Sequence, residues 1–226
     1  MNDALRVAVR SAGIATPVSV IPAFLPPSRR ELGQISPGTQ AWLDEGCGEP
    51  LLSAAVYRVL PPAFGGTDVY GLGVIEGLAR CLQRSGTRFR LAIMIACRPE
   101  GAAEEAFLID WERRVRALIG ERLHIALGEQ APPIIARSDV FLRPTTADGD
   151  SVSVREAAST GVSVVASDAA ARPAGTFLFP VGDVAAFDVA VRDALRHEKQ
   201  CSESSGESGV DAVIRIYESV LASESA

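Results

Sequence analysis

The chain shows two alternating patterns of hydrophobic and polar positions. Continuous apolar runs, such as LLSAAVYRV from residue 51 and RLAIMIA from residue 90, are typical of strands buried on both faces. The segments between them carry apolar residues every three or four positions, as in VYGLGVIEGLARCLQRSG, which stops at Gly86. Strands that alternate with helices in this way indicate a parallel sheet covered by helices on both faces. The predicted fold class is therefore α/β, doubly wound, with a single domain over residues 1–226.

The same patterns predict where each element lies. Strands are expected at 51–59, 90–96, 122–128, 139–145, 162–167 and 176–181. Helices are expected at 69–86, 103–120, 131–138, 151–160, 183–199 and 210–223, the fifth with Asp183 as its N-cap. Ahead of the sheet, the sequence predicts a helix at Asp3–Ser11, a strand at Val18–Phe24 and a short helix around Trp42. Residues 201–209 (CSESSGESG) are of low complexity and are expected to form a flexible linker.

Composition and charge limit the classes of function. The net charge of −6 and the pI near 5.1 leave no basic stripe to neutralise phosphates, so a general nucleic-acid binder is excluded. A small phosphate ligand needs only one or two arginines and a helix N-terminus, and it remains compatible with this charge. The sequence has no run of eighteen apolar residues and no signal-peptide pattern. We therefore expect a soluble, cytoplasmic protein.

Cysteines and histidines add little chemistry. The four cysteines are widely spaced and form no C-x2-C pair: Cys47, Cys81, Cys97 and Cys201. They predict neither a metal site nor a disulfide framework, and they are expected to be reduced thiols. His124 and His197 are expected to be structural, and no Ser-His-Asp or Cys-His arrangement is present. The sequence therefore does not point to covalent catalysis.

The most informative stretch is TTADGDSVSVREAASTGVSVVAS, at residues 145–167. In a parallel sheet, ligands bind at the carboxyl ends of strands, where a loop leads into a helix. Three such loops are candidates: 61–68, 128–133 and 145–151. The third loop leads into a helix that carries Glu156, and the polar or flexible residues at its mouth are Asp148, Gly149, Asp150, Ser151 and Ser153.

Two interpretations of this stretch stay open. Ser153 and Glu156 fit the capping pattern S-x-x-E, and Asp150 or Ser151 is a good N-cap, so hydrogen bonds to local backbone amides account for them. Alternatively, free amides at 149–153 bind an anion, while Asp148 and Glu156 accept hydrogen bonds from sugar hydroxyls. The two interpretations are not exclusive.

Arginines and glycines near other strand ends give weaker signals for a phosphate. Arg58, Arg143 and Arg172 lie beside predicted strand ends on the same edge of the sheet, and three arginines together are a better phosphate signal than one. The glycine-rich segment FGGTDVYG, residues 64–71, lies between a strand and a helix. It lacks the spacings of known phosphate-binding loops, so a plain turn accounts for it as well.

The order of motifs over residues 134–187 resembles the donor-binding half of retaining family-four (group 1) glycosyltransferases, which have two Rossmann-like domains in the GT-B fold. The matching positions are Asp139, Pro144-Thr145, Asp148-x7-Glu156, Gly161 and Pro180-Val181-Gly182-Asp183. The RPT, DGDS, REA and RP segments resemble a subgroup linked with bacterial surface polysaccharides. The resemblance covers nearly the whole chain, with residues 1–28 as a linker-like segment and 210–222 as a closing helix. It covers only the second half of such an enzyme.

The resemblance implies a role for each candidate residue. Glu156 matches the glutamate that holds the nucleotide ribose, and Asp148 matches a glutamate, one methylene longer, that holds donor-sugar hydroxyls. The amides of residues 149–151 match those that hold the sugar and the diphosphate. Arg58 matches the arginine of the family's Gly-Arg pair. The family's phosphate lysine is replaced by Tyr70, and Arg143 or Arg172 is the candidate substitute.

The implied function is the C-terminal, donor-binding half of a hexosyl-type glycosyltransferase. It would transfer a sugar, with retention, from a nucleotide-diphosphate sugar to a saccharide or glycoconjugate in polysaccharide biosynthesis. No cofactor and no bound metal are expected. The partner is an acceptor domain, either a missing N-terminal domain or a second chain, with peripheral membrane association through that half. Two alternatives stay open: a non-catalytic nucleotide-sugar-binding or regulatory subunit, and a sugar-nucleotide epimerase of the same overall fold.

Overall fold

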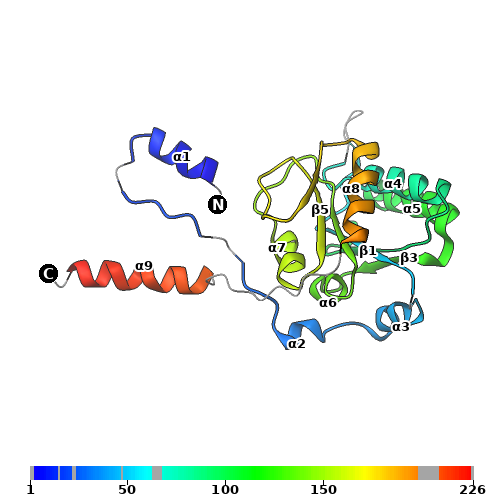
Figure 1. The fold of residues 1–226 in the computed structure, drawn as a ribbon, viewed down its shortest axis with the longest axis horizontal. Helices are drawn as coiled ribbons and strands as arrows, with labels where there is room; N and C mark the ends of the chain where they lie inside the picture. The colour runs from blue at the N-terminus through cyan, green and yellow to red at the C-terminus, as the bar shows by residue number, and fades with distance from the viewer. Residues whose placement is uncertain are drawn as a thin grey trace.

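The domain is built around one parallel sheet. A computed structural model of the chain describes residues 3–14, 16–21, 24–46, 48–62, 68–197 and 209–224. Six strands lie in the order β3-β2-β1-β4-β5-β6, and every neighbouring pair is parallel (Figure 1). Their bounds are β1 Leu51–Val56, β2 Arg90–Ile95, β3 Leu123–Leu127, β4 Val140–Arg143, β5 Ser163–Ser167 and β6 Phe177–Phe179. The predicted doubly wound α/β fold is confirmed, and the chain order reverses direction between β1 and β4.

Helices cover both faces of the sheet. Helices α4 (Leu72–Arg84), α5 (Ala102–Ile119) and α8 (Val184–Arg196) enclose one apolar core, and α3 (Pro37–Glu45), α6 (Pro132–Ile135) and α7 (Val152–Ser159) enclose the other. A single turn of 3-10 helix, Gly120–Arg122, connects α5 to β3. Successive residues of β1 alternate between the two cores: Leu51 belongs to one, and Leu52 belongs to the other. Both faces of the central strands are therefore buried, which agrees with their continuous apolar sequences.

The helical periodicity of the sequence corresponds to close packing in the structure. Trp111 of α5 is fully buried, and its indole Nε1–H donates to the carbonyl of Leu72 at 2.7 Å. Gly77 of α4 faces Val184 of α8 so closely that an added Cβ would lie 2.8 Å from a valine methyl. A larger residue at Gly77 would push these two helices apart.

One predicted strand is wrong. Of the segment Val18–Phe24, residues 18–21 and 24 form no strand, and residues 22 and 23 lie outside the described part of the chain. Pro17 precedes this segment and Pro22 lies inside it, and a proline has no N–H for a strand ladder. The predicted linker also lies almost entirely outside the described residues, as do positions 64–67 of the glycine-rich segment.

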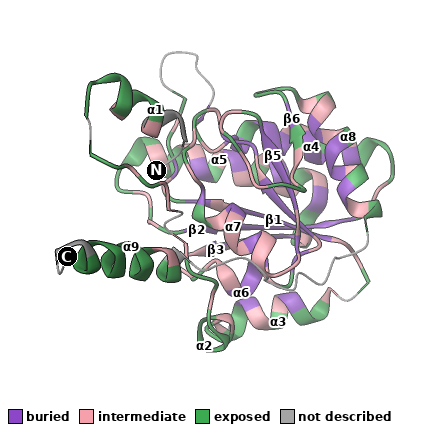
Figure 2. Ribbon diagram, turned by 60° about the vertical axis from the view of Figure 1, so that its left-hand side comes forward, coloured by how far each residue is buried: buried purple, intermediate pink, exposed green. Residues whose placement is uncertain are grey.

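Two helices lie away from the sheet, α1 (Asp3–Ser11) and α9 (Gly209–Glu224), as Figure 1 shows. Figure 2 shows α9 exposed along most of its length, in contrast to the buried strands. Its apolar residues recur at helical spacing, and Val213, Ile214 and Tyr217 are 39%, 48% and 68% exposed. Among the described residues, no helix is both long and apolar enough to cross a membrane.

Candidate functional site

A cavity of about 630 Å³ opens at the carboxyl ends of β1 to β4. It is lined by residues 55–57 at the end of β1, by the segment 128–132 after β3, and by the loop and first turns leading into α7. This is the point where the strand order reverses, which is the usual ligand position in doubly wound sheets. The loop at 145–151 and the loop at 128–133, both candidates from the sequence, therefore meet at one cavity.

Asp148 sits at one side of this cavity with all its hydrogen-bonding capacity used. Its Oδ2 accepts from Arg143 Nε at 2.9 Å, Arg172 Nη1 at 2.7 Å and Thr145 Oγ1 at 3.2 Å. Its Oδ1 accepts from Arg143 Nη2 at 3.1 Å and from the Gly149 amide at 3.0 Å. Burial alone would raise the pKa of Asp148, but the two guanidinium groups outweigh it and lower that pKa to about 2.

The two arginines are held as firmly as the carboxylate. Arg172, whose side chain is 2% exposed, also donates to the Ser167 carbonyl and to Thr145 Oγ1. Arg143 donates to the carbonyl of Ala55 at 3.0 Å, and its guanidinium lies 5.5 Å from the centre of the Tyr70 ring. Two cations surround one anion, so the cluster of Arg143, Asp148 and Arg172 carries a net positive charge beside the cavity.

Arg58 is placed elsewhere. Strand β1 ends at Val56, and the guanidinium of Arg58 turns toward α5, where it binds Glu104 at 2.7 Å and Glu100 at 2.9 Å. It does not line the cavity. The structure thus brings two of the three sequence-predicted arginines together and leaves the third in a separate ion pair.

The N-terminus of α7 has no side-chain cap. Ser151 is the N-cap residue by position, but its hydroxyl makes no capping hydrogen bond and instead lies 3.1 Å from the hydroxyl of Ser153. Asp150 is engaged by Arg155 at 2.6 Å. The capping interpretation of Ser153 and Glu156 is therefore wrong. The first amides of α7 remain available to an anion in the cavity.

Several other helix starts in the domain are capped by side chains, whereas α5 and α6 also begin without a side-chain cap. Asp68, which is 5% exposed, accepts from the amides of Leu72 and Gly73 at the start of α4. A complete capping box joins Ser28 and Glu31 at the short helix α2 (Arg29–Leu32). Because Asp68 already occupies the amides of Leu72 and Gly73, the start of α4 offers no comparable anion site among the described residues. The start of α6 also lines the cavity, but Pro132 and Pro133 there have no N–H to donate, whereas the first residues of α7 do.

The loops after β1 and β4 are joined beside this helix start. The amide of Thr146 donates to the carbonyl of Val69 at 3.0 Å. Gly71 has φ of +72°, and a Cβ at this position would lie 2.1 Å from the carbonyl oxygen of Pro144. Only glycine satisfies both the left-handed conformation and this close approach.

Glu156 lies one turn into α7 and lines the same cavity. Within the part of the chain that the structure describes, its carboxylate has neither a hydrogen-bond nor an ion-pair partner. Burial raises the pKa of Glu156, and the negative charge of Glu31 across the cavity raises it further. A half-buried carboxylate without a donor is costly, and a ligand with hydroxyl groups would satisfy it.

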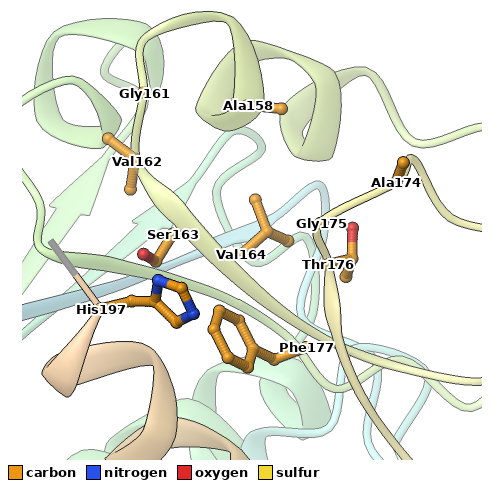
Figure 3. Close-up of a pocket in the computed structure, with 10 residues that line it drawn as sticks. All are labelled: Ala158, Gly161, Val162, Ser163, Val164, Ala174, Gly175, Thr176, Phe177 and His197. Atoms are coloured by element: carbon orange, nitrogen blue, oxygen red, sulfur yellow. The ribbon is translucent and has the colours of Figure 1, made fainter. Parts of the chain in front are cut away.

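A second hollow of about 320 Å³ lies at the opposite, amino end of β5 and β6. Figure 3 shows that mostly small and apolar residues line it and that the rings of Phe177 and His197 lie side by side. The two rings meet edge to face, with their centres 5.3 Å apart. It contains no carboxylate and no arginine. The chemistry predicted from the sequence lies at the other end of the sheet.

Sequence reasoning missed two acidic residues of the cavity, Glu31 and Glu129. Glu31 belongs to α2, which precedes the sheet and packs against α6. Glu129 lies inside a loop that the sequence did indicate, at 128–133, but its partners are almost a hundred residues away in the chain. No local pattern identifies such contacts.

The fold is a single Rossmann-like α/β domain with its cavity at the switch point of the sheet. Residues 75–197 match the family "Glycosyl transferases group 1". The chain therefore belongs to the group 1 glycosyl transferases. No curated protein sequence matches it.

Solved structures of similar fold include HepE from Anabaena in complex with UDP, with a TM-score of 0.64 at 16% identity over 97% of this chain and 62% of that chain. HepE in complex with UDP-glucose gives 0.63 at 17% identity with the same coverage. An α,α-trehalose-phosphate synthase (UDP-forming) from Burkholderia vietnamiensis gives 0.57 at 16% identity, over 75% of this chain and 40% of that chain. The chain thus spans less than two thirds of these proteins, and at such identities the similarity establishes the fold.

Proposed function

We propose that the chain binds a nucleotide-diphosphate sugar in the cavity at the carboxyl ends of β1 to β4, as the donor-binding half of a retaining glycosyltransferase. The observation that carries the proposal is the pairing of an uncapped helix start with an unsatisfied carboxylate, Glu156, on the same helix. The amides of residues 150–153 would hold the diphosphate, since the Gly149 amide of the anion site expected from the sequence already donates to Asp148. Glu156 would accept hydrogen bonds from the ribose hydroxyls.

The cluster of Arg143, Asp148 and Arg172 has a different role in this proposal from the one that the resemblance implies. Because five donors already occupy the Asp148 carboxylate, it has little capacity left for sugar hydroxyls. We assign to it the positioning of the two arginines, whose net positive charge would stabilise the leaving diphosphate. Tyr70 occupies the position of the family's phosphate-binding lysine, and Arg143, whose guanidinium lies beside the Tyr70 ring, would supply the positive charge in its place.

The proposal needs no cofactor and no metal step, since fixed charges and amides would supply the stabilisation. Uridine diphosphate is the first nucleotide to consider, because HepE, a protein of similar fold, forms complexes with UDP and UDP-glucose. A hexose-type sugar, a saccharide or glycoconjugate acceptor, a role in polysaccharide biosynthesis and a cytoplasmic location remain parts of the proposal.

An acceptor half would complete the enzyme. The structural relatives are longer than this chain, which covers 62% of HepE and 40% of the Burkholderia vietnamiensis synthase. We propose that a second domain, on the same chain or on a partner chain, contributes the acceptor site and any peripheral membrane contact. The exposed apolar stripe of α9 around Val213, Ile214 and Tyr217 is a surface suited to such a contact.

Calorimetric titration of the chain with UDP, GDP and ADP, each with and without magnesium, tests the proposal. We expect saturable binding of one nucleotide, which also identifies the base class. A folded sample that binds none of the three overturns the proposal.

A second candidate, a non-catalytic binding subunit, is favoured by the saturated Asp148 and by Tyr70 at the lysine position. The two candidates differ in their response to the sugar. A donor-binding half is expected to distinguish the free nucleotide from the nucleotide sugar, because groups near Asp148 contact the sugar. A module that holds only the nucleotide would bind both with equal affinity.

A further inference from the structure

A continuous chain of hydrogen bonds links the edge strand of the sheet to the cavity. His124 of β3 lies 2.8 Å, through its Nε2, from the hydroxyl of Thr39 in α3. The same hydroxyl donates to Glu129 Oε1 at 2.7 Å, and the hydroxyl of Ser36 donates to that oxygen at 2.9 Å. Glu129 is a cavity residue, whereas Thr39 is only 1% exposed. A buried hydroxyl therefore connects a strand, a helix and the cavity wall.

The order of protons in this chain follows from its geometry. The single proton of the Thr39 hydroxyl must point to the ionised Glu129, because an acceptor facing an acceptor at 2.7 Å would be repulsive. Thr39 then has only lone pairs for His124, so Nε2 of the ring carries the proton. Burial lowers the pKa of His124, and the negative charge of Glu129 opposes this shift only in part. The hydrogen bonds of this chain therefore all donate in one direction, from the His124 ring to Thr39 and from Thr39 to the Glu129 carboxylate.

Aromatic contacts hold His124, the end of the hydrogen-bond chain farthest from the cavity. Trp42 of α3 stacks on His124 with ring centres 4.9 Å apart, and its indole N–H donates to the Glu121 carbonyl at 2.9 Å. The guanidinium of Arg90, on β2, lies 3.7 Å from the centre of the Trp42 ring. Helix α3 is thus bound to the edge of the sheet at several points, and Glu129 is bound to α3.

Glu129 belongs to the short segment that closes the cavity opposite α7. Gly128, with φ of +76°, donates its amide to the Ile95 carbonyl at 2.7 Å, and α6 begins at Pro132. Between these two fixed points, the side chain of Glu129 is the attachment to α3. In the proposed function, Glu156 and the α7 amides hold the ribose and the diphosphate, so the base is left to face residues 128–131 and Met94.

We propose that Glu129 is a positioning residue: held by Thr39 and Ser36, it keeps the backbone of residues 128–131 in the arrangement that receives the nucleotide base. This inference rests on the proposed function, because it assigns one wall of the same cavity. If residues 128–131 are already ordered before binding, less conformational entropy is lost when the nucleotide binds. Their backbone groups are then also aligned with the edge of one base. The alternative is a purely structural role, in which Glu129 only stabilises the start of α3 through its contact with the N-cap residue Ser36.

The test uses Thr39→Val, which keeps the shape of a buried residue and removes the hydroxyl, with Thr39→Ser as the conservative variant that retains it. Glu129→Ala is a second variant that removes the acceptor. Asp183→Ala is the matched control, because Asp183 caps α8 through the Ala186 amide at 2.9 Å and does not line the cavity. For each variant, calorimetry gives the affinity for UDP, GDP and ADP, and hydrogen exchange reports the amides of residues 129–131.

We expect Thr39→Val and Glu129→Ala to lower the affinity for the preferred nucleotide by roughly 3- to 10-fold. In both variants, the difference in affinity between the preferred nucleotide and the other two should become smaller. The amides of residues 129–131 should also exchange their hydrogens faster. Thr39→Ser should restore all three properties, and Asp183→Ala should lower only the melting temperature. If Thr39→Val and Glu129→Ala bind and discriminate as the wild type does, Glu129 only caps α3 and the inference is wrong. If the wild type binds no nucleotide, the proposed function fails first and the inference fails with it.

Discussion

Two carboxylates eight residues apart, Asp148 and Glu156, flank the same helix start and have opposite environments. Asp148 accepts five hydrogen bonds, and its pKa is lowered to about 2 by Arg143 and Arg172 despite its burial. Glu156 is also buried in part, has no donor among the described residues, and its pKa is raised. One carboxylate is satisfied by the protein itself, whereas the other is left for something else to satisfy.

This difference separates a structural role from a ligand-binding role where sequence spacing cannot. Both residues are acids close to the loop at 145–151, and the resemblance implies that each binds the hydroxyl groups of a sugar. The structure supplies the distinction through their partners. A carboxylate that holds two buried arginines together contributes to folding, and a carboxylate that costs free energy in the empty cavity is suited to binding.

The largest expected effect is on stability, in Asp148→Asn. The substitution leaves two guanidinium groups, 2% and 13% exposed, without their shared counter-charge. We expect the free energy of unfolding to fall by roughly 3–5 kcal/mol, the usual cost of breaking a buried ion pair on one side. Urea unfolding monitored by circular dichroism measures it. If Asp148→Asn lowered the free energy of unfolding no more than Glu156→Gln does, the two carboxylates would not differ in their contribution to stability.

The next effect is on binding, in Glu156→Gln. The amide retains the size of the side chain but loses the charged acceptor, so nucleotide affinity should fall roughly 10- to 150-fold, equivalent to about 1.5–3 kcal/mol for a charged hydrogen bond. Stability should stay constant or rise slightly, because the unsatisfied charge is gone. Calorimetric titration and a thermal melt of the same sample give both values. Unchanged affinity together with a lower melting temperature would assign Glu156 to the fold.

The two acids should also respond to pH in opposite directions. The folded pKa of Asp148, about 2, lies below its ordinary value of 3.8, so its stabilisation is present above that value and is lost as the pH falls through about 2. This contribution amounts to about 2 kcal/mol. The folded pKa of Glu156 lies above 4.5, so its ionisation lowers stability as the pH rises through that value. Unfolding curves of the wild type and of both variants between pH 2 and pH 6 separate the two slopes.

The smallest effect tests the open helix start. Ser151 makes no capping hydrogen bond, so Ser151→Ala should change the free energy of unfolding by less than about 0.5 kcal/mol. Asp183 does cap its helix, and Asp183→Ala should cost about 1 kcal/mol. Thermal melts of the two variants side by side make the comparison. Equal losses would mean that the α7 amides are capped after all.

Much of the fold could be predicted from the sequence, because strand and helix periods are local. The six strands and the helices between them follow from runs such as RLAIMIA and from stops such as Gly86. The strand expected at Val18–Phe24 failed because an apolar run alone does not supply a neighbouring strand. Propensity is a weak guide where no partner is present.

The site could be located from the sequence but not understood from it. The loop at 145–151 and Glu156 were identified as candidates, and both lie at the cavity. The pairing of Arg172 with Asp148 joins residues 24 positions apart, and Thr39 with Glu129 joins residues 90 apart. Such contacts depend on how the chain is folded around the sheet. The same three arginines could be free or paired, and only their neighbours in space decide which.

The contact between Gly71 and Pro144 has a consequence for the rates of ligand exchange. Because no side chain separates these two residues, and because Thr146 and Val69 share a backbone hydrogen bond, the loops after β1 and β4 cannot slide past each other. A displacement of one loop carries the other with it. Ligand release at the start of α7 should therefore involve both loops in a single relaxation, and one time constant should describe it.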